Sequence, residues 1–132
     1  MNIAAYKRTI SETEAPRQIE RRLLAQVTSE LERGYLDFDQ AERKIDKLQL
    51  LADGLRHTLW KNEQLWAAFK TDLASQGNGF NPELKSALLS LSIWVERHTQ
   101  GVMAGSNKIK PLIDVNRSIF HGLGGKVFSE ME

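Results

Sequence analysis

Residues 39–74 read DQAERKIDKLQLLADGLRHTLWKNEQLWAAFKTDLA, and this stretch decides the fold. One mainly apolar series of side chains recurs along it at alternating spacings of four and three residues. The series consists of Ala41, Ile45, Leu48, Ala52, Leu55, Leu59, Asn62, Trp66, Phe69 and Leu73. Because the phase of the repeat passes unchanged through Gly54, the pattern predicts one continuous helix. At about 1.5 Å per residue it would be roughly 50 Å long and would form the centre of the molecule.

Three shorter helices are predicted around this central helix. Residues that favour helix ends mark them: Gly34 stops the first, Asn81 and Pro82 begin the second, and Pro111 opens the third. The predicted helices span about 14–33, 82–104 and 111–122. Each carries an apolar stripe, and no strand pattern persists for five residues. The expected fold class is therefore an all-α four-helix bundle built on the long central helix of about 39–74.

The composition fits one small domain. A chain of 132 residues with 41% hydrophobic residues can form one core, so we expect a single helical domain over 1–132. Within it, 1–12 would be a flexible arm and 125–132 a frayed tail. The absence of cysteine excludes disulfides and agrees with a reducing compartment, so the expected location is the cytoplasm.

Charge and hydropathy argue against two classes of partner. No apolar run approaches the roughly 20 residues that span a bilayer, so membrane insertion is not expected. Acidic and basic residues are interspersed and the net charge is +1, which lacks the basic footprint of a dedicated nucleic-acid binder. Direct nucleic-acid binding is not expected either.

No constellation of residues indicates catalysis or a bound cofactor. His57, His98 and His121 are widely separated and lack the spacing of paired metal ligands. No carboxylate is flanked by a nucleophile and a base. We therefore expect no enzyme activity, no catalytic residue, no cofactor and no metal site.

The large side chains of the predicted helices divide into core positions and partner-contact positions. The expected core includes Leu59, Asn62, Trp66, Phe69, Leu91, Trp94, Val95 and His98. Asn62, a polar residue at an apolar position of the repeat, is interpreted as fixing the register of the helices.

Trp60 projects about 100° from the repeat, so it either meets another helix or contacts a partner. Leu89 and Ile93 form a second apolar strip on the outer face of the helix at 82–104. The expected partner-binding surface consists of Trp60, Leu89, Ile93, Glu96 and Arg97.

Short motifs in a characteristic order cover nearly the whole chain. They are Ala5-Tyr6, the run Ser11 to Leu24, Asn62 with Leu65-Trp66, Gly77-Asn78, Pro82-Glu83-Leu84, and the runs Leu89 to Thr99 and Pro111 to Ile119. In this order and spacing they resemble the FlaF family of bacterial flagellar biosynthesis proteins. The resemblance implies a small cytoplasmic protein that acts with flagellin in its synthesis and export. Such proteins often act beside FlbT, a second regulator that acts on flagellin message.

The resemblance implies one main function and leaves two alternatives. The main hypothesis is an export chaperone that holds the terminal amphipathic helices of flagellin in an apolar groove and supports the regulation of flagellin synthesis. The first alternative is a helical post-transcriptional regulator that contacts flagellin mRNA directly or through an FlbT-like partner. The second is a structural interaction module without chaperone activity.

Overall fold

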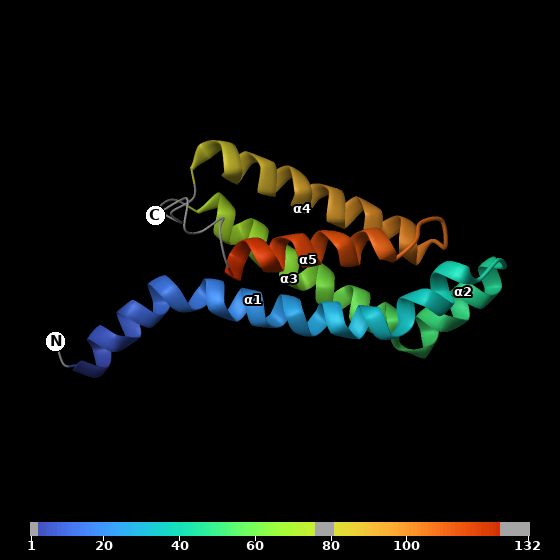
Figure 1. Ribbon diagram of the computed structural model, residues 1–132, viewed down its shortest axis with the longest axis horizontal. Helices are drawn as coiled ribbons and strands as arrows, with labels where there is room; N and C mark the ends of the chain where they lie inside the picture. Colours follow the sequence, from blue (N-terminus) through green and yellow to red (C-terminus); the bar gives the residue numbers. More distant parts are fainter. Residues whose placement is uncertain (1–2, 76–80, 125–132) are drawn as a thin grey trace.

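The computed structural model describes residues 3–75 and 81–124, with side chains described at 18–75 and 81–122, and it is an all-α bundle. Four long helices pack against one another, and no strand occurs in the described residues (Figure 1). The elements are α1 (Ile3–Gln40), α2 (Lys44–Leu50), the short π-helix η1 (Leu51–Leu55), α3 (Arg56–Ala74), α4 (Pro82–Met103) and α5 (Lys110–Gly124). The expected fold class is confirmed, but several expected helix boundaries are wrong.

The predicted continuous helix over 39–74 does not exist. Residues 41–43 separate α1 from α2, and Gly54 leaves the helical conformation with φ 135° and ψ −23°. Only glycine adopts such a positive φ without a steric cost from Cβ. Figure 1 shows the chain changing direction between α2 and α3. The apolar repeat predicts burial only after the bend, where its members from Leu55 to Leu73 are buried. Before the bend, Ile45 and Ala52 of the repeat are exposed, and the buried side chain there is Leu51, which lies outside the repeat.

The longest helix is α1, with 38 residues, and it exceeds the predicted 14–33 at both ends. Residues 3–12, expected to form an arm, are helical, and Thr13 and Pro16 lie inside the helix. Gly34 does not end the helix. A Cβ atom at Gly34 would lie 2.9 Å from Leu55 Cδ2, so the glycine permits a close approach of η1 to α1.

The starts of α4 and α5 depend on side-chain caps. Asn81 caps α4 as expected: its Oδ1 accepts a hydrogen bond from Leu84 N at 2.8 Å. The N-terminus of α5 is capped by Asp39 of α1, whose carboxylate accepts bonds from Ile109 N at 2.7 Å and Lys110 N at 3.0 Å. Asp39 thus caps a helix that begins about seventy residues further along the chain.

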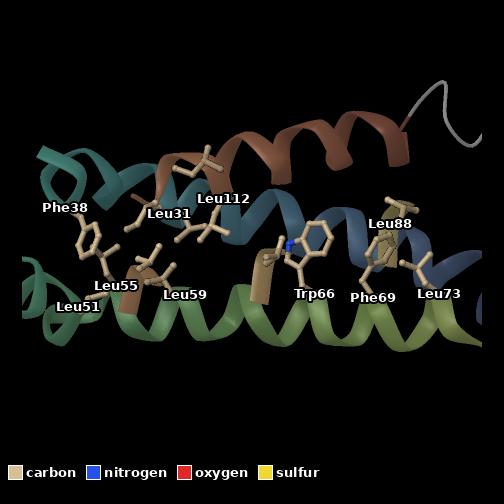
Figure 2. Close-up of a cluster of buried hydrophobic side chains, with 14 residues drawn as sticks. Leu31, Phe38, Leu51, Leu55, Leu59, Trp66, Phe69, Leu73, Leu88 and Leu112 are labelled. Atoms are coloured by element: carbon tan, nitrogen blue, oxygen red, sulfur yellow. The ribbon is translucent and has the colours of Figure 1, made fainter. Parts of the chain in front are cut away.

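The core lies between α3 and its neighbours, with α5 resting on one side of α3 between α1 and α4 (Figure 1). Figure 2 shows Leu59, Trp66 and Phe69 projecting from α3 into this apolar interior. One buried polar chain crosses it. Trp66 Nε1 donates to Asn116 Oδ1 at 2.9 Å, and Asn116 Nδ2 donates to Asn62 Oδ1 at 2.8 Å. Because a buried polar group is costly when unpaired, this chain favours one register of α5 on α3.

Candidate partner-binding grooves

An apolar groove lies between α1 and α3. It has a volume of about 380 Å³, and we call it the Trp60 groove. Its main lining residues are Leu23, Val27, Glu30, Trp60, Leu65 and Ala68. Trp60 is 51% exposed and Leu23 is 43% exposed. Large apolar side chains are therefore left in contact with water inside a concave surface.

The helical repeat of α1 and α3 places these side chains. Ile19, Leu23 and Val27 follow one another at intervals of four residues, so they share one side of α1. Ile19, 43% exposed, extends the apolar surface by one turn. Trp60 follows the buried Leu59 and so points away from the core. His57 stacks on the indole of Trp60 with ring centroids 5.7 Å apart, which restricts its orientation.

The charged residues of the Trp60 groove neutralise each other. Lys61 Nζ on α3 lies 2.5 Å from Glu30 Oε2 on α1. This ion pair bridges the two helices along the groove. What remains for a ligand in the Trp60 groove is mainly apolar surface.

A second groove lies on the other side of α3, against α4, and we call it the acidic groove. It has a volume of about 570 Å³, and its main lining residues are Glu63, Ala67, Lys70, Ser92, Val95 and Glu96. Partial burial raises the pKa of the Glu63 carboxyl, and repulsion from Glu96 raises the same pKa further. Gln64 lines both grooves, so the two grooves adjoin across α3.

The structure separates the residues expected to bind a partner. Trp60 lines the Trp60 groove and Glu96 lines the acidic groove, whereas Leu89 and Ile93 line neither. Ile93 is 39% exposed and Arg97 is exposed, but Leu89 is partly buried against the core. The single groove expected from Trp60, Leu89 and Ile93 is therefore replaced by two grooves with other lining residues.

The reason lies in the buried face of α4, which includes two hydroxyl residues. Its buried residues are Leu88, Ser92, Val95, Thr99 and Val102. Ser92 Oγ donates to Leu88 O at 2.9 Å and Thr99 Oγ1 donates to Val95 O at 2.6 Å, so both hydroxyls are satisfied within the helix. Because these hydroxyl residues interrupt the apolar pattern, the sequence predicts a core face that includes Leu91, Trp94 and His98 and leaves Leu89 outside.

The residues expected in the core are not equally buried. Leu59, Asn62, Trp66, Phe69 and Val95 are buried. Leu91, Trp94 and His98 are only partly buried. His98 stacks on Trp94 with centroids 4.7 Å apart, and its Nε2 donates to Lys108 O at 2.7 Å. These two side chains thus support the connection between α4 and α5.

The sequence does not predict the α1 side of the Trp60 groove, because an apolar stripe along a helix ordinarily indicates core. Leu23 and Leu24 are consecutive, so their side chains diverge by about 100° and one neighbouring helix does not cover both. Leu24 is buried and Leu23 is not. Consecutive leucines flanked by Ile19 and Val27 were the available signal of an apolar stripe wider than one interface.

Two classes of feature are not found in the described part of the chain. No group of three or more histidine, aspartate or glutamate side chains there could hold a metal ion. None of its helices is long and apolar enough to cross a membrane.

Comparison with known proteins gives one match. Residues 2–123 match the family model described as flagellar protein FlaF. Neither the curated proteins nor the solved structures contain a significant match to the chain. Because the family match covers nearly the whole sequence, this chain belongs to the FlaF family of flagellar proteins.

Proposed function

We propose that this protein binds flagellin in the cytoplasm, acts as its export chaperone and supports the regulation of flagellin synthesis. Membership of a flagellar protein family supports a flagellar partner. The observation that carries the binding proposal is the Trp60 groove, an exposed apolar surface in a hollow between two packed helices. Such a groove is suited to the apolar face of an amphipathic helix, and the terminal segments of flagellin are helices of that kind.

The exposed apolar surface of the groove would supply part of the binding free energy. About half of Trp60 is accessible, which for a tryptophan is on the order of 125 Å². Covering that area at about 25 cal/mol per Å² would contribute about 3 kcal/mol, before the entropic cost of association. Leu23 and Ile19 would add to this contribution. A micromolar complex needs about 8 kcal/mol, so contacts outside this groove must supply the rest of the binding free energy.

Occupation of the groove also explains how a chaperone would act. Terminal helices of flagellin self-associate by burying their apolar faces. A bound copy of this protein would cover one such face, so flagellin would stay monomeric until it is handed to the export apparatus. Binding must be reversible, because flagellin has to be released for export.

The test uses purified full-length protein and purified monomeric flagellin, with and without its C-terminal segment. Calorimetry measures the dissociation constant, and light scattering follows flagellin polymerisation. We expect binding that requires a terminal segment and a delay of polymerisation that grows with protein concentration. If the wild-type protein neither binds flagellin nor delays polymerisation, the proposal is wrong.

A matched pair of variants tests whether the groove is responsible. Leu23 in the groove and Leu36 outside it are both exposed leucines of α1, at 43% and 51%. Leu23→Asp should raise the dissociation constant at least tenfold and lower flagellin secretion in cells. Leu36→Asp should change neither quantity. Circular dichroism should show unchanged helicity in both, since neither side chain is buried.

A further inference from the structure

We propose that the occupant of the Trp60 groove is an amphipathic helix that also carries a lysine or arginine, and that this basic side chain enters the acidic groove between Glu63 and Glu96. The inference rests on the proposed function for the identity of the natural partner. It deepens that function by stating the charge and shape that the partner must have.

The backbone around the groove favours a helical ligand. Both walls of the Trp60 groove are α-helices, whose interior N–H and C=O groups are already paired. They offer no sheet edge with which an extended peptide could pair its own backbone. A ligand that brings its backbone hydrogen bonds already satisfied is a helix.

The dimensions of the groove agree with a short stretch of helix. Its lining residues span 23–30 on α1 and 60–68 on α3, which is about two turns on each helix. Ala67 and Ala68 on the outer side of α3 are small, so a ligand helix can approach closely there. Two or three apolar side chains of the ligand would meet Leu23, Trp60 and Ala68.

The charge pattern selects a basic ligand. Glu63 and Glu96 line one groove and repel each other, and neither forms an ion pair in the described part of the structure. Lys70 lines the same groove, so its two carboxylates and one ammonium leave a formal charge of −1. The Trp60 groove, by contrast, contains the closed Glu30–Lys61 pair. A cation placed between Glu63 and Glu96 would relieve their repulsion.

The geometry connects the two requirements. Gln64 belongs to both grooves, and beyond it the small Ala67 lines the acidic groove and the small Ala68 lines the Trp60 groove. A helix seated in the Trp60 groove can therefore extend a long basic side chain across α3 into the acidic groove. An acidic side chain in the same place would meet two carboxylates and would be rejected.

The experiment uses the full-length protein and two synthetic amphipathic helical peptides of about 18 residues, or five turns. They share one leucine face, and the polar face is lysine in one peptide and glutamate in the other. Trp60 is exposed, so its fluorescence should shift to shorter wavelength when either peptide covers it, and a Trp60→Phe variant assigns the signal. The chain's net charge is +1, so non-specific attraction would favour the glutamate peptide.

We expect the lysine peptide to bind at least tenfold more tightly than the glutamate peptide. Glu63→Gln with Glu96→Gln should remove most of this preference, and Leu23→Asp should weaken both peptides. Glu42→Gln, an exposed carboxyl outside both grooves, should change nothing. Both glutamine variants should fold, because each only removes an exposed or repelling charge.

Equal affinity for the two peptides, or an undiminished preference in the double glutamine variant, would overturn the inference. So would a Trp60-dependent dimer in sedimentation, since the occupant would then be a second copy of the chain. These outcomes do not depend on flagellin. If flagellin binds the double glutamine variant as tightly as it binds the wild type, the proposed flagellin binding is retained and the contact of a basic side chain with Glu63 and Glu96 is refuted. If flagellin fails to bind while the peptides behave as expected, the preference of the grooves for a basic amphipathic helix is retained and flagellin is refuted as the partner.

Discussion

Replacing Asp39 by alanine should detach the start of α5 from the end of α1. The Asp39 carboxylate accepts hydrogen bonds from Ile109 N at 2.7 Å and from Lys110 N at 3.0 Å. These are the first free N–H groups of α5, and an alanine side chain cannot accept hydrogen bonds from them. The substitution also removes a negative charge from the positive end of the helix dipole.

The expected cost is about 2 kcal/mol of unfolding free energy. Loss of an N-cap side chain costs typically about 1 kcal/mol, and removal of the charge at the dipole adds about 0.5 to 1 kcal/mol. A chain of 132 residues has an unfolding entropy on the order of 280 cal/mol/K. The melting temperature should therefore fall by about 7 °C.

Urea and thermal unfolding, followed by circular dichroism, measure this loss. Asp37→Ala is the matched control, because Asp37 is an exposed aspartate two residues earlier in the same helix and makes no such cap. It should change the unfolding free energy by less than about 0.5 kcal/mol. If the two alanine variants are equally stable, the cap does not hold α5 and the reasoning is refuted.

Two further predictions concern the bend and the acidic groove. Gly54→Ala should lower the free energy of unfolding, measured in urea, by about 1 to 2 kcal/mol, because φ at this residue is 135° and a side chain strains the backbone there. Steric contact is not the cause, since a Cβ at Gly54 would meet no atom within 4 Å. A stabilised variant would contradict the bend. Glu63→Gln should raise the urea midpoint near neutral pH, because burial and repulsion from Glu96 raise the pKa of Glu63 in the folded state. Folded protein then holds this proton more tightly than unfolded protein, so wild-type stability falls as pH rises from the ordinary carboxyl pKa through the raised one. The advantage of the glutamine variant should vanish when the pH is lowered below the ordinary glutamate pKa, and Glu42→Gln should show no such pH-dependent gain.

The candidate site was predictable only in part. Trp60 stood out because it lies off the apolar repeat, and it does line an exposed groove. The residues opposite it, Leu23 and Val27, lie 33 or more positions away in sequence, and the pairing of α1 with α3 depends on how the chain turns. The pairing of Glu63 with Glu96 depends in the same way on the packing of α4 against α3.

Local chemistry by itself determined the helical class, the buried repeat along α3 and the cap at Asn81. Each depends on side chains within a few residues of one another, and so does the periodicity that reveals it. Tertiary packing alone decided whether a glycine ends, bends or continues a helix. Gly34 continues α1, and its missing Cβ leaves room for Leu55 of a distant segment, whereas Gly54 bends the chain with φ 135°. Both glycines carry the same intrinsic cost in a helix, so the path that the packed helices impose on the chain distinguishes the two outcomes.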